Sequence, residues 1–204
     1  MTPLKETLTI QQGRTFRLPV RWESDEFAYA AISAIPQQAP CRITAANHGI
    51  PDKWRAAVVS VKGMVEINAE LDEATKLPLD KAYRRVKRIS TDQVEFNDLN
   101  AADFSAYVSG GYLQYRVPHP LTGYTARMSI KDKVGGTELL PLTVANGRIS
   151  IDETNFVVNL YISAADTALM TKGGVYDLEM VAPGGDVFVI MTGGVSVVKE
   201  VTTL

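Results

Sequence analysis

Short runs rich in Val, Ile and Thr, separated by turn signals, are the feature that most constrains the fold of this 204-residue chain. Branched side chains pack well on a pleated surface and lose freedom in a helix, so such runs favour strands. Many of the separators are glycine pairs, which adopt positive φ at little steric cost and mark tight turns. Turn signals about 8 to 12 residues apart are typical of an antiparallel sandwich or barrel. We therefore predict an all-β fold. The expected turns contain Gly135-Gly136, Asn146-Gly147, Gly173-Gly174, Gly184-Gly185 and Gly193-Gly194, and the expected strands are Glu6–Gln12, Thr15–Trp22, Gln38–Ala45, Ala56–Val61, Tyr83–Ser90, Gln93–Asn97, Tyr112–Val117, Thr122–Lys131, Glu138–Val144, Arg148–Asp152, Phe156–Ser163, Val175–Val181, Val187–Met191 and Val195–Thr202.

Side-chain alternation within these runs supports the strand prediction. In Val175–Met180 the apolar residues Tyr176, Leu178 and Met180 lie on one face and two acids lie on the other. Thr125–Ile130 alternates in the same way. Each is expected to be a half-buried strand with one solvent-exposed face.

Two segments predict short helices. Ser163–Met170 opens with Ser163 as a plausible N-cap, and an acid follows three residues later. Asn100–Tyr107 opens with Asn100 as N-cap and ends before a Ser-Gly-Gly turn.

Two breaks divide the chain. Glu23–Glu26 is a polar interruption after a predicted strand, and Pro118–Pro120 is a second interruption because proline fixes φ and restricts the residue before it. We therefore predict a discontinuous antiparallel β-sandwich made of 1–24 and 118–204. Residues 25–117 would form a second, small β-barrel-like module inserted into it. Such insertions are tolerated at loop tips whose ends lie close together.

Composition removes several classes of function. The net charge is −2, which gives no global attraction to nucleic acid or to an anionic membrane. The longest apolar run, Phe27–Ile32, is far shorter than the roughly 20 residues of a membrane helix. The first residues lack the apolar core of a signal peptide, and a single cysteine excludes an intrachain disulfide framework. We expect a soluble protein made in a reducing compartment.

Few residues are available for chemistry. Cys41, His48 and His119 have no orienting partner at a recognisable spacing, and no nucleophile-elbow, phosphate-binding or calcium-loop motif is present. Cys41 is expected to be a small buried strand residue, His48 part of a tight Asn-His-Gly turn, and His119 a structural residue between two prolines. We predict no catalytic residue, no bound cofactor and no metal site.

One charge run stands out, because five of the eight residues in Lys81–Arg88 are basic. A nucleic-acid site would use these residues with Tyr83 as a stacking platform. Acidic residues surround the run in sequence, however, and exposed charges of this kind also discourage edge-to-edge aggregation. A solvated edge or an interface for an acidic protein is therefore the favoured interpretation. The interface candidates from this run are Arg84, Arg85, Lys87 and Arg88.

The C-terminal part carries a resemblance to a known family. Leu121–Ile130, Gly147–Ile151, Gly174–Glu179 and Gly194–Thr202 follow one another as a Leu-Thr-Gly strand, a Gly-Arg-Ile-Ser-Ile strand, a Tyr-Asp-Leu strand and a closing Glu-Val-Thr strand. This order resembles small β-sandwich proteins of tailed bacteriophages, found in tail tips, baseplates and fibre-attachment modules. Ile10–Phe16 resembles the opening strand of the same domain.

The central part resembles something else. Ala39–Ala45, Asn47–Pro51, Val61–Asn68 and Tyr107–Gly111 carry a His-Gly turn, a Gly-Met-x-Glu-Ile-Asn turn and a Tyr-x-Ser-Gly-Gly end. They resemble a phage module that is similar to the β-barrel FCCH region of ubiquitin-activating enzymes, the first catalytic-cysteine half-domain. Ile67 stands where leucine is commoner. The resemblance implies no activating chemistry, because that family's catalytic cysteine lies outside the barrel and this chain has no nucleotide-binding motif.

The two resemblances together imply a structural component of a phage tail, in the baseplate or tail tip, that acts as an assembly adaptor and not as an enzyme. Two alternatives stay open. A receptor- or glycan-binding tail protein could stack sugars on exposed aromatic rings, and a tail-associated hydrolase would need paired carboxylates in a cleft. The rings considered for stacking are Trp54, Tyr107, Tyr112, Tyr115 and Tyr124.

The resemblance also implies where the protein acts and with what. We expect it in the virion tail, after synthesis in the bacterial host cytoplasm, in contact with other tail or baseplate proteins. A symmetric homo-oligomer in the virion is expected, since tail organelles use repeated interfaces. Neither nucleic acid nor membrane insertion is expected. The closing strand is a further candidate for pairing between chains, with Val195, Val197, Lys199 and Val201 as its interface residues.

Overall fold

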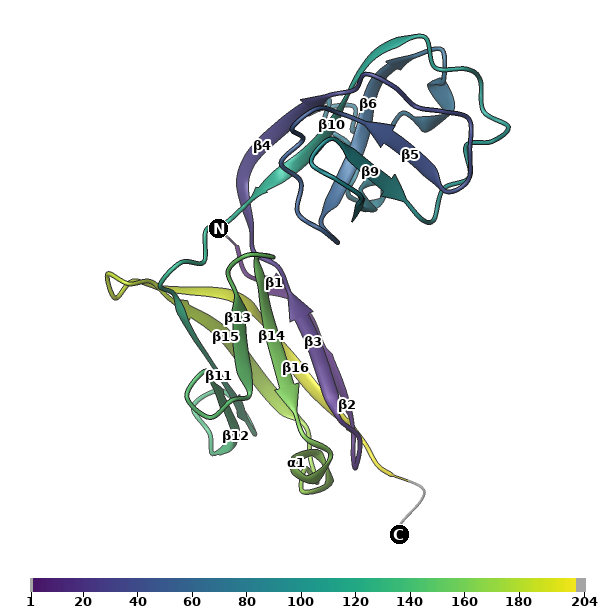
Figure 1. The fold of residues 1–204 in the computed structure, drawn as a ribbon. Helices are drawn as coiled ribbons and strands as arrows, with labels where there is room; N and C mark the ends of the chain where they lie inside the picture. Colours follow the sequence, from purple (N-terminus) through teal and green to yellow (C-terminus); the bar gives the residue numbers. More distant parts are fainter. Residues whose placement is uncertain (1, 201–204) are drawn as a thin grey trace. The chain divides into compact units, whose positions relative to one another are not determined.

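The computed structural model describes residues 2–200 and is nearly all β, with 48% of residues in strands and 6% in helices. The predicted all-β fold is confirmed. The chain divides into two compact units, one made of Met1–Trp22 and Pro118–Leu204 and the other of Glu23–Val117 (Figure 1). The first unit ends at Trp22, two residues before the boundary expected from the sequence.

The first unit contains two sheets. The large sheet has the order β1-β16-β15-β11-β12, with β2 also paired to β16, and the small sheet has the order β13-β14-β3. Pairing is antiparallel except that β1 and β2 run parallel to β16. The large sheet consists of β1 (Leu4–Lys5), β2 (Leu8–Gln11), β11 (Thr125–Lys131), β12 (Glu138–Thr143), β15 (Gly174–Val181) and β16 (Val187–Val198), and the small sheet of β3 (Phe16–Val20), β13 (Ile149–Asp152) and β14 (Val157–Ile162).

The core of this unit is built by alternate residues of the two sheets. Met128 and Ile130 of β11 are buried beside Leu178 and Met180 of β15, and Leu160 of β14 belongs to the same cluster. The alternation predicted for both long strands is therefore confirmed. Each such side chain stabilises the fold by about 1.5–3 kcal/mol relative to leaving it exposed.

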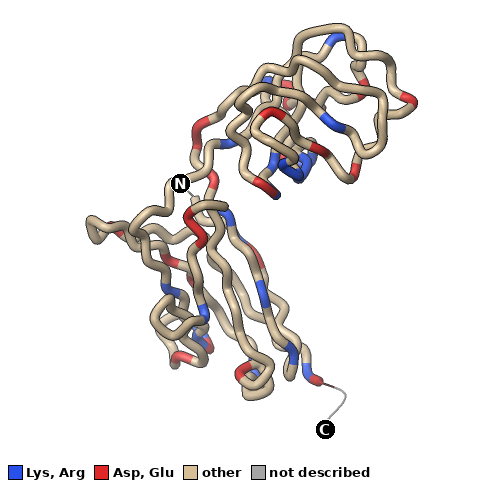
Figure 2. Tube along the Cα trace, in the orientation of Figure 1, with Lys and Arg blue, Asp and Glu red and all other residues tan. Residues whose placement is uncertain are grey.

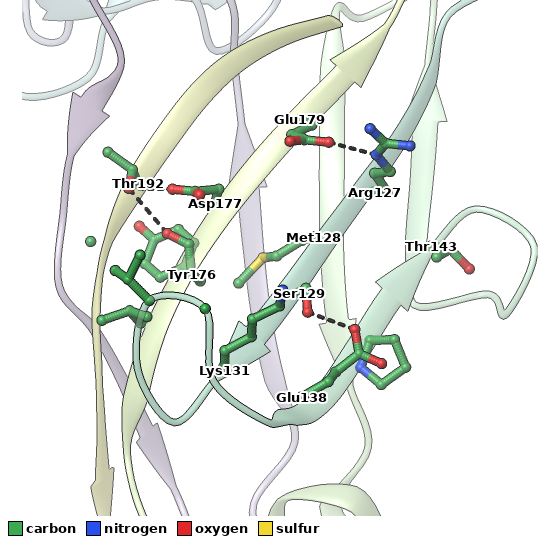
Figure 3. A pocket seen from close by; sticks show the side chains of 15 residues that line it. Arg127, Met128, Ser129, Lys131, Glu138, Thr143, Tyr176, Asp177, Glu179 and Thr192 are labelled. Carbon is green, nitrogen blue, oxygen red and sulfur yellow. Dashed lines mark hydrogen bonds and ion pairs between the residues drawn. The ribbon is translucent and has the colours of Figure 1, made fainter.

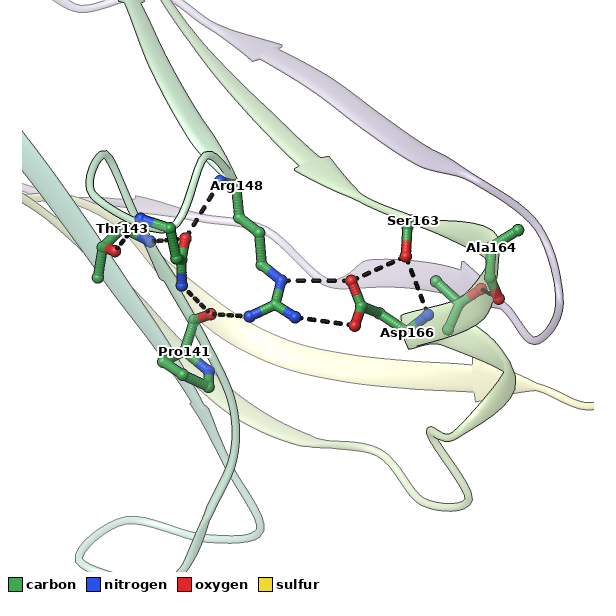
Figure 4. Close-up of polar contacts among 8 residues, drawn as sticks. Pro141, Thr143, Arg148, Ser163, Ala164 and Asp166 are labelled. Atoms are coloured by element: carbon green, nitrogen blue, oxygen red, sulfur yellow. Dashed lines mark hydrogen bonds and ion pairs between the residues drawn. The ribbon is translucent and has the colours of Figure 1, made fainter.

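A short helix, α1 (Ala164–Ala168), follows β14. Its predicted N-cap is confirmed, because Ser163 Oγ accepts a hydrogen bond from the Asp166 backbone N–H at 3.0 Å. Asp166 also receives two bonds from the guanidinium of Arg148, at 3.3 and 2.8 Å (Figure 4). Arg148 in turn donates to the Pro141 carbonyl on β12, so one side chain ties the helix to the last strand of the large sheet.

The second unit also contains two sheets, with the orders β4-β10-β6-β7 and β5-β9-β8. Trp54, Phe96, Ile43, Leu113 and Met64 are fully buried at its centre. The elements are β4 (Glu23–Ala31), β5 (Cys41–Thr44), β6 (Arg55–Lys62), β7 (Arg84–Arg85), β8 (Lys87–Arg88), β9 (Gln93–Phe96), β10 (Ser109–Pro118) and the 3-10 helices η1 (Val65–Ile67) and η2 (Asp80–Ala82).

One residue carries the chain from one of these sheets to the other. Val86 separates β7 from β8; its N–H donates to the Trp54 carbonyl at 2.7 Å, and its carbonyl accepts from the Lys53 N–H at 2.8 Å. The single strand predicted over Tyr83–Ser90 is therefore two short strands in different sheets.

The boundary between the units falls at the start of the polar stretch Glu23–Glu26, but this stretch is not a loop, because its residues begin the nine-residue strand β4. Their polarity reflects position: β4 is the last strand of its sheet, and Asp25 and Glu26 are exposed. Charged residues are common on such edges, where they discourage aggregation.

The helix predicted at Asn100–Tyr107 does not form; the segment consists of turns and irregular backbone. Asn100 Oδ1 accepts from the Ala102 N–H, and the Tyr107 hydroxyl donates to backbone carbonyls. Ala101, fully buried, donates its N–H to Gln38. Bonds to the rest of the unit thus replace the helical pattern.

The turn predicted at Gly193-Gly194 is also wrong, since both glycines lie inside β16, which joins the two strands expected there. A Cβ at Gly193 would lie 1.9 Å from the Glu6 carbonyl oxygen. The glycine therefore allows the N-terminal segment to approach β16 closely and does not reverse the chain.

Candidate functional site

The three residues considered for catalysis have structural contacts. Cys41 is fully buried, and burial raises the pKa of its thiol to about 11. His48 is buried in the expected turn; its Nδ1 accepts from the Ile50 N–H at 3.0 Å and its Nε2 donates to the Ser90 carbonyl at 3.0 Å. Burial lowers the pKa of His48, so both bonds are made by the neutral ring.

His119 belongs to an aromatic cluster in the first unit. Its ring stacks on Trp22 with centroids 3.7 Å apart, and its Nε2 is hydrogen-bonded to the Tyr124 hydroxyl at 3.1 Å. Burial lowers the pKa of His119. Phe188 also belongs to this cluster, with its ring centroid 5.5 Å from that of Trp22.

Most of the aromatic rings considered for sugar stacking are held in contacts within the protein. Trp54 is fully buried and donates its indole N–H to the Arg116 carbonyl, and the buried Tyr115 donates its hydroxyl to the His48 carbonyl. Tyr112 is the exception at 46% exposure, and it meets Tyr29, 54% exposed, in an edge-to-face pair.

The motif residues of the second unit form a turn that links several segments. The Asn68 side chain bonds both backbone groups of Val61, accepting at 2.8 Å and donating at 3.0 Å. Glu66 accepts two bonds from Ser105, and a Cβ at Gly63 would meet the Ala106 carbonyl oxygen at 2.3 Å. The spacing of the Gly-Met-x-Glu-Ile-Asn motif thus has a structural reason.

The basic run lines a groove on the second unit with a volume of about 520 Å³. Arg84 pairs with Asp98 at 2.7 Å, and Lys87 pairs with Glu95 at 3.2 Å. Figure 2 shows several Lys and Arg positions close together at one place on the trace of the second unit. The residues lining this basic groove are Asp52, Lys53, Arg85, Val86, Lys87, Asn97 and Asp98.

Glu95, the ion-pair partner of Lys87, is a buried carboxylate with its side chain 5% exposed. It accepts from Arg42 at 3.0 Å as well as from Lys87. The hydrogen bond from Arg42 and the contact with Lys87 hold the pKa of Glu95 below its usual range. Two cations therefore share one carboxylate.

A second surface lies on the outer face of the large sheet, where a hollow of about 560 Å³ opens (Figure 3). Arg127, Ser129 and Lys131 project there because the alternate residues of β11 are buried in the core. The strand register places Arg127 opposite Glu179 and Ser129 opposite Asp177. We call this surface the outer-sheet hollow. It is lined by Arg127, Met128, Ser129, Lys131, Val134, Gly135, Glu138, Pro141, Thr143, Val175, Tyr176, Asp177, Glu179, Thr192 and Gly193.

Each carboxylate of the outer-sheet hollow has a donor. Glu179 pairs with Arg127, Glu138 accepts from the Ser129 hydroxyl at 2.6 Å, and Asp177 accepts from Thr192. The result is a polar face with fixed charge pairs. Sequence analysis identified two of these strands as half-exposed but missed the site, because strand alternation does not show which strands are neighbours.

The closing strand has partners on both sides at Val195, which is opposite Leu8 of β2 and Gly174 of β15. Val195 is buried and Val197 packs against the core, so neither side chain is presented on a free surface. Lys199 lies beyond the end of β16, and Val201 lies outside the described residues.

Within residues 2–200 no group of three or more His, Cys, Asp or Glu side chains is placed to hold a metal ion. In the same part of the chain no helix has the length and apolar character needed to cross a membrane. No protein-family model and no curated protein sequence matches this chain.

Proposed function

We propose that the chain is a structural component of a phage tail, in the baseplate or tail tip, that joins other tail proteins as an assembly adaptor. The observation that carries the proposal is the division into two units, each with its own core and its own charged hollow. A chain of this kind can hold one partner on each unit. The resemblances to tail sandwich domains and to an inserted phage module supply the biological setting.

The placement of the chemically capable residues favours this function over an enzyme. Cys41 and His48 are buried in structural contacts, and the three carboxylates of the outer-sheet hollow each accept from a neighbouring side chain. A glycosidase needs one carboxylic acid that keeps its proton, in surroundings that disfavour its charge. The open, donor-rich face of the large sheet does not supply such surroundings.

The test is the protein inventory of purified virions from the phage that encodes the chain. Mass spectrometry is expected to find it in stoichiometric amounts with other tail proteins, and deletion of its gene should give particles arrested in tail assembly. Particles that contain no copy of the chain, together with complete tails after deletion, would contradict the proposal. Symmetric copies are expected in a map of the tail.

A receptor- or glycan-binding tail protein is the second candidate, favoured by the exposed pair Tyr29 and Tyr112. Exposed aromatic rings are common sites of recognition because they offer a large apolar face with a polar tip. A glycan array separates the two functions. Binding that is lost in Tyr112→Ala would favour receptor recognition over assembly.

A further inference from the structure

The basic groove of the second unit carries more positive charge than its own acids neutralise. Asp98 is already paired with Arg84, and Glu95 is shared between Arg42 and Lys87. Among residues 2–200, Arg85 and Lys53 make no ion pair. Counting the groove with its ion-pair partners, five cations (Arg42, Lys53, Arg84, Arg85 and Lys87) face three carboxylates (Asp52, Glu95 and Asp98).

The backbone fixes two of these cations at a regular spacing. Val86 is buried, so the residues on either side of it, Arg85 and Lys87, point outward in the alternation of an extended chain. Residues two apart in a strand are separated by about 6.6 Å. Both backbone groups of Val86 are bonded to the Lys53–Trp54 segment, and Lys53 lines the same groove.

We infer that the basic groove binds an acidic, extended segment of a partner polypeptide. Carboxylates on alternate residues of an extended peptide have the same spacing of about 6.6 Å as Arg85 and Lys87. A guanidinium binds a carboxylate through two parallel hydrogen bonds, and Arg85 makes no ion pair with an acid among residues 2–200. This inference deepens the proposed adaptor function, on which it rests, by giving the chemistry of one partner.

The same observations favour a peptide over nucleic acid. The stacking platform that single-stranded nucleic acid would need, Tyr83, does not line the groove; it lines a separate hollow, where Arg55 lies over its ring at 5.7 Å. Affinity for nucleic acid also requires a row of phosphate contacts. The surplus of charge is confined to one short segment of a chain whose net charge is −2.

The experiment uses the purified full chain and fluorescence anisotropy. The probes are a short labelled peptide in which Asp alternates with Ser, the same peptide with Asn in place of Asp, and a single-stranded oligothymidylate of equal charge. We expect the Asp peptide to bind and the other two to bind at least about tenfold more weakly. Arg85→Gln should weaken Asp-peptide binding by about tenfold, the value of one charge-assisted pair. Lys62→Gln, which removes an exposed cation from the end of β6, is the matched control and should change nothing.

Four results would overturn the inference: no binding of the Asp peptide, equal binding of the Asn peptide, equal or tighter binding of the oligothymidylate, or equal loss in Arg85→Gln and Lys62→Gln. The exposed Arg85 has no ion pair to lose, so unchanged thermal unfolding of Arg85→Gln verifies that the fold is intact. Peptide binding is measured without virions, so its absence would contradict the inference even if the chain is found in tails. Conversely, peptide binding by a chain that is absent from tails would contradict only the proposed function.

Discussion

His119 lies directly against Trp22: its backbone N–H donates to the Trp22 carbonyl at 2.9 Å and the two rings stack at an interplanar angle of 25°. Trp22 is the last residue of the first unit before the chain enters the second. His119 follows Pro118, the residue at which the chain enters the first unit again. The two connections between the units are therefore fixed next to each other by a contact that belongs to the first unit alone.

This contact predicts that the second unit can be excised. A protein in which Trp22 is joined to Pro118 through a short Gly/Ser linker keeps the complete core cluster of the first unit, so it should fold as a β-rich protein. Circular dichroism and urea denaturation should show strand content and one cooperative transition. Residues 23–117, expressed alone, should also unfold cooperatively, since Trp54, Phe96 and Leu113 form a core of their own. Aggregation of the first protein together with an unfolded second one would mean that the units share a core.

The two histidines predict how stability depends on pH. Burial lowers the pKa of both His48 and His119, so the unfolded chain binds more protons than the folded chain as the pH falls below about 6.5. Stability is complete above the unfolded pKa and is lost as the pH falls toward the folded values. We expect the free energy of unfolding to decrease between about pH 7.5 and 5.5.

Chemical denaturation across this range is the measurement, with His119→Gln as the test variant. The variant should show a smaller slope, because only His48 still titrates; protonation there would abolish the bond that Nδ1 accepts from Ile50. The lowered pKa of Asp166 belongs to a more acidic range and does not contribute between these pH values. A free energy of unfolding that stays constant over the range would contradict the prediction.

Asn68 is predicted to hold its turn through two bonds to Val61. Asn68→Ala leaves the Val61 N–H and carbonyl without their partner, and a part-buried pair of this kind should cost about 1–3 kcal/mol of unfolding free energy. Asn97→Ala is the matched control, because Asn97 is exposed. Urea denaturation of the two variants checks the prediction, which fails if both lose the same stability.

How far the sequence predicted this structure depends on the range of the interactions involved. Alternation in Val175–Met180 and the cap at Ser163 are local signals, and both are present in the structure. The pair Gly193-Gly194 is a local turn signal. The sequence does not show the actual reason for Gly193, which is the close approach of Glu6 from a remote part of the chain. The local sequence pattern of Asn100–Tyr107 predicts a helix. The bonds that replace it, to Gln38 and Ile32, depend on the tertiary fold and are not visible in the sequence.

The same distinction applies to the candidate sites. The run of basic residues in the sequence predicts Arg85 and Lys87 as interface candidates, and the basic groove contains both. The outer-sheet hollow depends on the pairing of Arg127 with Glu179, which are brought together by the register of β11 with β15. Val195 and Val197 looked like candidates for a free strand, but β2 from the start of the chain pairs with that segment.

Arg148 links β12, the last strand of the large sheet, to α1, and the last prediction concerns this residue (Figure 4). Its Nη1 donates to the Pro141 carbonyl of β12 at 3.1 Å, and its other two contacts hold the Asp166 carboxylate at the start of α1. The bonds from Arg148, followed by that from Ser163, hold the pKa of Asp166 below its usual range. An Asp with a lowered pKa stabilises the fold above its unfolded pKa, and this contribution is lost as the pH falls through the folded value.

Arg148→Ala should therefore lower the free energy of unfolding at neutral pH by about 1–2 kcal/mol, a value reduced for the partial exposure of both side chains. Arg148→Lys keeps the charge but cannot bond both carboxylate oxygens and the Pro141 carbonyl together, so it should recover only part of the loss. The difference between wild type and Arg148→Ala, measured at neutral pH, should shrink at an acidic pH below the lowered pKa of Asp166, where the carboxylate is protonated and the ion pair disappears. Urea denaturation at the two pH values measures both effects. Equal stability of Arg148→Lys and wild type would show that charge alone suffices, and a pH-independent difference would show that the Pro141 contact, and not Asp166, accounts for the stabilisation.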